Sequence, residues 1–176
     1  MPPFEQQRHQ DHRPPNEDHT LIVACAPMRS NVNISGIART ASASGIKRLI
    51  LCGNAKLISK IARDGADELE VDVHRSLPPI LRKLRDQEDF RLVGLEQTTK
   101  SQNLYTYSFA KRTVLVIGNE RLGITEDILA ELDDVIEIPV YGLPHSFNAS
   151  SATAMALYEY RRQLARPEEG SAPSQA

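Results

Sequence analysis

The chain has 176 residues, of which 40% are hydrophobic and 25% charged, a composition that suits one globular domain with a core. No run of 18 or more apolar residues is present, and residues 1–19 lack the apolar stretch of a signal peptide, so we expect a cytoplasmic protein with no membrane segment. The formal net charge of −2 excludes an overall basic character, so any surface that binds nucleic acid must be local.

The two ends of the chain differ in composition from its middle. Residues 1–19 and 167–176 are polar, rich in proline and poor in aliphatic side chains, which predicts disordered tails around one folded domain at 20–166. Cys25 and Cys52 lie in or at the end of apolar runs, where cysteine is typically a small buried hydrophobe. Neither a disulfide framework nor a zinc site is indicated.

Strand-like apolar runs alternate with helical patterns through the middle of the chain, which predicts an α/β fold with a mostly parallel sheet flanked by helices. In chain order we expect strand 20–26, helix 34–44, strand 48–52, helix 56–62, a short run LEVDV at 69–73, a helix opening at Pro78 and Pro79, strands 90–96 and 112–118, a helix capped by Thr125, strand 134–140 and helix 149–164. Because open α/β sheets bind ligands at the carboxyl ends of their strands, a functional site is expected in the loops that follow them.

The first such loop, PMRSNVNISGIARTASASG, carries Asn33, Gly36 and Arg39. Fewer than two helical turns separate Asn33 from Arg39, so we expect both side chains to face one cleft. Taken alone, the segment also fits an amphipathic helix on which Arg39 is merely a surface residue.

The second loop, VIGNERLGI, places Gly118 directly after a strand and Gly123 just before a helix. Glycines allow the backbone to approach a ligand, and a helix start offers free N–H donors. The spacing matches neither the G-x-G-x-x-G of dinucleotide-binding folds nor the Gly-Lys-Ser/Thr of a P-loop. A plain strand-to-helix turn also accounts for it.

The third loop, IPVYGLPHSFNASSATA, is dense in residues that bend the backbone and in short polar side chains at a helix start. The bending residues are Pro139, Gly142 and Pro144, and the polar ones are Ser146, Asn148, Ser150 and Ser151. Asn148 or Ser150 alternatively serves only as an N-cap.

In this order and spacing, the three segments resemble the three sequence motifs of the SpoU (TrmH-like) family of SPOUT RNA 2'-O-methyltransferases. The resemblance covers residues 20–166, with motif two at 117–124 and motif three at 138–154. The consensus Ser-Leu-Asn-Val-Ser of motif three is matched here by SFNAS, in which Phe147 and Ala149 are apolar exchanges. The segment GLEQTTKS further resembles the group that methylates guanosine 18 in the tRNA D-loop.

The resemblance implies a carboxyl-terminal trefoil knot, although threaded chains are very rare among folds. The knot would bind S-adenosyl-L-methionine, and the family is homodimeric, with the motif-one helix and the last helix at the interface. The residues carried over as cofactor-binding are Glu96, Gly118, Ile138, Gly142, Leu143, Phe147 and Asn148.

The reaction implied is methyl transfer to a ribose 2'-hydroxyl, with Arg39 as the catalytic arginine. A guanidinium stays protonated in proteins, so clamping an RNA phosphate is a safer role for Arg39 than general base. Asn33, Ser146 and Asn148 would orient the ribose and the arginine. Glu120 would pair with Arg39 or hold the ribose.

Three functions remain open. The favoured substrate is tRNA, at the D-loop guanosine; the rival is rRNA, whose enzymes often carry an amino-terminal RNA-binding domain that 19 polar residues are too few to form. A catalytically silent RNA-binding scaffold is the third, although the presence of Arg39, Asn148 and Ser150 argues against it. No metal is required, and no histidine has ligand spacing.

Overall fold

The computed structural model describes residues 18–63 and 67–164. The expected tails therefore lie outside the described residues, apart from Asp18 and His19, and their disorder stays a prediction. Within the described ranges no helix has the length and apolarity needed to span a membrane.

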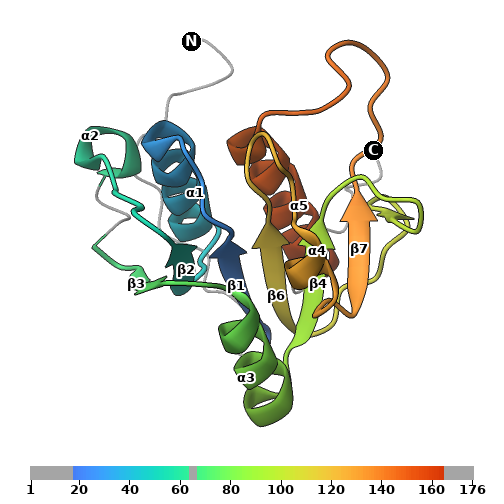
Figure 1. Cartoon of the computed structure of the whole chain (residues 1–176), viewed down its shortest axis with the longest axis horizontal. Coiled ribbons are helices and arrows are strands. Elements are labelled where there is room, and N and C mark those ends of the chain that lie inside the picture. Colours follow the sequence, from blue (N-terminus) through green and yellow to red (C-terminus); the bar gives the residue numbers. More distant parts are fainter. Residues whose placement is uncertain (1–17, 64–66, 165–176) are drawn as a thin grey trace, which may run out of the picture.

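In the part of the chain that the structure describes, seven parallel strands form one sheet in the order β3-β2-β1-β6-β4-β7-β5 (Figure 1). Their bounds are β1 Thr20–Cys25, β2 Arg48–Cys52, β3 Glu70–His74, β4 Arg91–Leu95, β5 Gln102–Asn103, β6 Arg112–Ile117 and β7 Asp134–Glu137. β1 and β6 pair over their whole lengths, from Thr20 opposite Arg112 to Cys25 opposite Ile117. The expected α/β class is confirmed, with every strand pair parallel.

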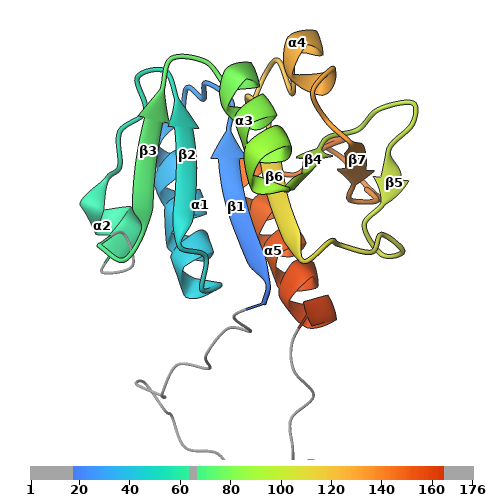
Figure 2. The same cartoon turned by 90° about the horizontal axis from the view of Figure 1, so that it is seen from below.

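The helices of the described residues cover both faces of this sheet, and Figure 2 shows α1 and α5 behind the strands and α3 in front of them. Their bounds are α1 Asn31–Ala43, α2 Ser59–Ala62, α3 Pro78–Glu88, α4 Glu126–Leu129 and α5 Ala149–Leu164. α1 and α5 lie side by side on one face, and α3 and α4 lie on the other. Because both faces are covered, the central strands are buried on both sides, which explains their nearly continuous aliphatic sequences.

Each face of the sheet has its own apolar core. Val23, Leu115 and the helical residue Ile37 belong to the core under α1 and α5, whereas Ile22 and Val114 belong to the core under α3 and α4. Neighbouring residues of a strand point to opposite faces, so each central strand contributes to both cores. Cys25 and Cys52 are buried in different cores, and burial raises the pKa of each thiol, to about 12 and about 11.

Two helices differ from the sequence prediction for local reasons. α1 begins three residues earlier than expected, because the Ser30 hydroxyl accepts a bond from the Asn33 amide and caps the helix there. α2 is only four residues long, since the Ile58 amide before it donates to the Ser35 hydroxyl of α1 at 2.8 Å. The two-residue strand β5 was not expected, and Thr125 precedes α4 without making a side-chain cap.

The last helix is fixed to the sheet through Tyr160, which is fully buried. Its ring meets Phe109 edge-on at 5.4 Å, and its hydroxyl donates to the Lys111 carbonyl at 3.1 Å. The same carbonyl also accepts the Thr20 amide at 2.8 Å, so it is not dependent on the tyrosine for a partner. The hydrophobic ring is therefore the main contribution of Tyr160 to stability.

Two substitutions separate these contributions. Tyr160→Ala should lower the free energy of unfolding by about 3–5 kcal/mol, because it leaves a cavity between α5 and the sheet. Tyr160→Phe should cost about 1 kcal/mol or less, since the Lys111 carbonyl keeps its backbone bond. Urea titrations of both variants measure the difference, and equal losses would contradict the assignment to the ring.

Candidate active site

A cavity of about 510 Å³ opens at the carboxyl ends of β4, β6 and β7. The last residue of each of these strands, Leu95, Ile117 and Glu137, lines it. The remaining lining residues are Asn33, Glu96, Gln97, Gly118, Asn119, Glu120, Arg121, Gly123, Ile138, Val140, Pro144, Ser146, Phe147, Asn148, Ala149 and Ala152. All three loops singled out in the sequence thus contribute to one cavity, in the size range of small-molecule sites.

The turn after β6 forms the wall nearest the centre of the sheet. Asn119 and Gly123 exchange both backbone hydrogen bonds at 2.9 Å, and Gly123 has φ of 65°, which favours glycine. A Cβ on Gly118 would lie 2.5 Å from the Gly123 carbonyl carbon. Both glycines are therefore required by the closed turn itself, before any ligand is considered.

Glu96 holds this turn against the end of β4. Its carboxylate accepts the Ile124 amide at 3.0 Å and the Gln97 amide at 3.0 Å. A side chain at Gly123 would collide with the same carboxylate, at 2.4 Å. The side chain of Glu96 thus positions the cavity wall.

A chain of side-chain hydrogen bonds joins the three loops. Glu120 accepts the amides of Arg29 and Ser30, at 3.1 and 3.0 Å, and the Asn33 amide group at 3.1 Å. The Asn33 side-chain oxygen in turn accepts a bond from Asn148 Nδ2 at 3.0 Å. Residues from positions 29–33, 120 and 148 are therefore held in one fixed arrangement.

Asn148 also caps the last helix. Its Oδ1 accepts the amides of Ser150 at 2.9 Å and Ser151 at 3.4 Å, which satisfies N–H groups that have no partner within α5. The capping interpretation is thus correct, and it coexists with the bond to Asn33. The Asn148 side chain therefore donates through Nδ2 to Asn33 and accepts through Oδ1 from the start of α5.

The charge of Glu120 is stabilised by its partners. Partial burial acts to raise its pKa, but the hydrogen bonds donated by the Arg29 and Ser30 amides and by Asn33 outweigh this and hold the pKa below its ordinary value. An ionised carboxylate accepts only, so Asn33 must turn its NH₂ toward Glu120 and its oxygen toward Asn148.

Most of the predicted site residues lie on the cavity wall. Those that do are Asn33, Glu120, Ser146, Asn148, Glu96, Gly118, Ile138 and Phe147. Gly142 and Leu143 do not; Leu143 is 81% exposed, and nothing lies within 4 Å of a Cβ built on Gly142. They lie at the tip of a loop that leads away from the cavity, because the loop bends at Val140 and returns at Pro144, both of which line it.

Arg39 does not share a cleft with Asn33 in this chain. Six residues at about 100° each place the two side chains roughly 120° apart around the helix, so less than two turns of separation is not enough to align them. Arg39 is exposed, and no described residue hydrogen-bonds to its guanidinium or forms an ion pair with it. Glu120 pairs with backbone amides and Asn33 rather than with Arg39.

Four polar residues of the cavity were missed by the sequence analysis: Gln97, Asn119, Arg121 and Glu137. Asn119 organises the second loop: its Oδ1 accepts the amides of Arg121 and Leu122, and its Nδ2 donates to the Pro27 carbonyl at 2.7 Å. Asparagine after glycine in a turn is the signal for such bonds. Arg121 has no signal beyond its place in the same loop. Among the described residues, no cluster of three or more His, Cys, Asp or Glu is arranged to hold a metal ion.

Known proteins resemble this chain over nearly the whole described fold. The SpoU rRNA Methylase family matches residues 20–158. A tRNA (guanosine(18)-2'-O)-methyltransferase of Aquifex aeolicus (strain VF5) is 33% identical over 154 residues, covering 85% of this chain and 72% of that protein. One of Mus musculus is 29% identical over 148 residues, which are 81% of this chain but 9% of that protein. The 23S rRNA (guanosine-2'-O-)-methyltransferase RlmB of Acinetobacter baylyi is 28% identical over 153 residues, 84% of this chain and 62% of that protein.

Solved structures show the same likeness. The A. aeolicus TrmH/SpoU tRNA modifying enzyme superposes with a TM-score of 0.77 at 30% identity, over 85% of this chain and 76% of that one. The SpoU methyltransferase AviRb from Streptomyces viridochromogenes, in complex with the cofactor AdoMet, has a TM-score of 0.72 at 28% identity, over 85% of this chain and 62% of that one. The chain covers between 9% and 76% of the length of these relatives.

The ionised state of Glu120 gives a pH-dependent prediction. Glu120→Gln should lower the melting temperature by about 2–4 °C at neutral pH, because one amide oxygen cannot accept three donors. Since the folded pKa is below 4.5, the stabilisation is full above pH 4.5 and is lost as the pH falls through the folded pKa. The difference between wild type and variant should therefore shrink below pH 4.5.

Calorimetric scans across pH 3–7 measure this difference. Glu68→Gln, at an exposed position where no hydrogen bond is seen, is the matched control and should leave the melting temperature within about 1 °C. A pH-independent loss at Glu120 would contradict the role given to its charge.

Proposed function

The chain belongs to the SpoU rRNA Methylase family, and on that premise we propose that it transfers a methyl group from S-adenosyl-L-methionine to a ribose 2'-hydroxyl of RNA. The observation that carries the proposal is the bonded network of Asn33, Glu120 and Asn148, one residue from each loop, at the wall of a ligand-sized cavity. This network joins the three loops at one cavity, and it supports an enzyme over a silent scaffold.

The cavity wall fits this cofactor in its chemistry. Apolar side chains of Leu95, Ile138 and Phe147 offer surface for the adenine ring, and the carboxylates of Glu96, Glu120 and Glu137 make the cavity acidic. When bound, the cofactor supplies a methyl group activated by a sulfonium. An acidic wall favours that positive charge. The AdoMet complex of AviRb, a structural neighbour, supports the same choice.

The side chains of this chain would bind and orient rather than exchange protons. Asn33 and Asn148 are fixed by Glu120 and by the start of α5, so they are preorganised to receive the ribose. Ser146 lies beside them on the wall. Arg39 stays protonated and offers a planar fork of donors, which suits the RNA phosphate next to the target ribose.

For the RNA substrate we propose tRNA, at the guanosine of the D-loop. The relatives of Aquifex and mouse carry that activity in their names, and this chain covers 72% of the Aquifex protein. The Acinetobacter relative acts by name on 23S rRNA, which makes rRNA the second candidate.

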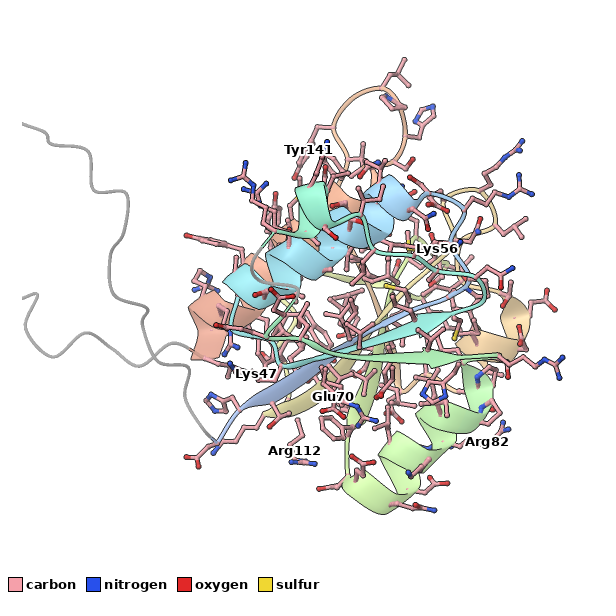
Figure 3. The ribbon with its side chains drawn as sticks, turned by 90° about the vertical axis from the view of Figure 1, so that its left-hand side faces the viewer. Lys47, Lys56, Glu70, Arg82, Arg112 and Tyr141 are labelled. Carbon is pink, nitrogen blue, oxygen red and sulfur yellow. The ribbon has the colours of Figure 1, made fainter. Side chains whose placement is uncertain are left out.

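We also propose the trefoil knot and the homodimer. The segment after β7 returns across the ends of β4 and β6 before α5 packs beside α1, a path compatible with threading. The surface formed by α1, α5 and the loop before α5 exposes several large apolar side chains, and Figure 3 shows Tyr141 of that loop beyond α1. The exposed apolar side chains are Val32 58%, Tyr141 87%, Leu143 81%, Met155 39% and Tyr158 75%. A second copy is the occupant that we propose for this face.

Mapping of ribose methylation tests the function directly. Purified protein with S-adenosyl-L-methionine should render one phosphodiester of unmodified tRNA resistant to alkali, next to the D-loop guanosine. Alkali resistance that appears only in rRNA would show that rRNA, not tRNA, is the substrate. If the protein binds the cofactor but methylates neither RNA, the proposed reaction is contradicted.

Substitutions at Arg39 and Asn148 should fail differently. Arg39→Ala should leave the cofactor dissociation constant nearly unchanged and lower the single-turnover rate about a hundredfold or more, the effect of removing one charge-stabilising donor. Asn148→Ala should weaken cofactor binding as well, because it releases both α5 and Asn33. Arg39→Lys should recover activity only in part, since lysine lacks the bidentate fork.

Calorimetry and single-turnover rates on the same preparations measure these effects. Arg75→Ala removes an exposed arginine outside the cavity and is the control. If Arg39→Ala loses cofactor affinity but methylates normally at saturating cofactor, the roles assigned here to Arg39 and Asn148 are wrong.

The dimer predicts a complementation result. The protein should sediment at twice 19.6 kDa. Because Arg39 lies off its own cavity, we expect it to act at the cavity of the partner subunit. Mixing inactive Arg39→Ala and Asn148→Ala chains should then restore about a quarter of the sites. Half of the dimers are mixed, and each mixed dimer has one intact site out of two. An active monomer, or a mixture without activity, would contradict this arrangement.

A further inference from the structure

Arg121 is the single cationic side chain among the described residues that line the cavity. The same wall carries three carboxylates, those of Glu96, Glu120 and Glu137. The cavity is therefore acidic, with one positive group on the turn after β6. Nothing in the proposed reaction has so far used that group.

All three carboxylates already have hydrogen-bond donors. Glu96 and Glu120 accept backbone amides, and Glu137 lies 2.7 Å from the Ser101 hydroxyl. None of them pairs with Arg121, whose side chain is exposed and makes no hydrogen bond or ion pair with any described residue. The guanidinium is thus free to bind a ligand.

The backbone of Arg121 is nevertheless fixed. Its amide donates to Asn119 Oδ1 at 2.9 Å, inside the turn that Asn119 and Gly123 close. Asn119 is itself held by the Pro27 carbonyl. The backbone thus fixes the position of Arg121 on the cavity wall, while its guanidinium remains available to a ligand.

We propose that Arg121 binds the carboxylate of the cofactor's amino-acid tail. This inference rests on the proposed function. S-adenosyl-L-methionine has two positive groups, the sulfonium and the ammonium, which an acidic wall attracts, and a single negative one, which that wall repels. The guanidinium fork matches a carboxylate in bidentate geometry, so Arg121 supplies what the remaining wall lacks.

The test compares two ligands that differ only in this group, S-adenosyl-L-methionine and its decarboxylated form, which keeps the sulfonium and the amine. Calorimetry with wild type and Arg121→Gln gives a cycle of four affinities. We expect Arg121→Gln to weaken S-adenosyl-L-methionine about tenfold or more, as for loss of a charged hydrogen bond, and to leave the decarboxylated ligand within about twofold. Arg75→Gln, the same change outside the cavity, should alter neither.

The outcomes separate the two levels of the proposal. Equal weakening of both ligands, or no weakening of either, overturns the role of Arg121 and leaves the proposed function standing. If Arg121→Gln instead lowers RNA affinity and the salt dependence of RNA binding, with both cofactor affinities unchanged, the anion is an RNA phosphate and the inference is wrong. Failure of folded wild type to bind S-adenosyl-L-methionine at all overturns the proposed function together with it.

Discussion

The site depends on one ionised carboxylate. Glu120 has two oxygens that only accept, and they receive two backbone amides and the Asn33 NH₂ group. Because the Asn33 NH₂ group faces Glu120, the Asn33 side-chain oxygen faces Asn148 and accepts a hydrogen bond from its Nδ2. The Asn148 Oδ1 is then left to accept the amides at the start of α5. The orientation of every polar group in the network therefore follows from a charge held by backbone N–H groups, and the network needs no ligand to be ordered.

Much of the fold could be predicted because its signals are local. Aliphatic runs buried on both faces mark β1, β2, β4 and β6, and proline pairs or strings of small residues mark the starts of α3 and α5. The predicted helix and strand bounds were wrong where a residue far away in the sequence determines the local structure. The Ser35 hydroxyl of α1 holds the Ile58 amide and shortens α2, and β5 exists only because Gln102 and Asn103 can pair with β7. No window of sequence contains both partners.

For the site, as for the fold, local signals were predictable and long-range contacts were not. Membership of the cavity was predictable for residues directly after strands, such as Gly118 and Ile138, because parallel strands end at one edge. Direction was not. Whether Glu120 turns to Arg39 or to Asn33, and whether Leu143 points in or out, depends on the path of loops in space. Arg121 carries no motif signal, and its isolation from the three acids is visible only in the structure.

The bonds that define the cavity join residues far apart in the chain: Asn33 to Glu120 across 87 positions and Asn33 to Asn148 across 115. Contacts of such long separation close large loops, which costs conformational entropy and slows folding. During synthesis the amino-terminal strands emerge first, and no ribosome-bound fragment that ends before Asn148 contains a complete cavity. Only a chain that has been synthesised past Asn148 can therefore form the complete cavity.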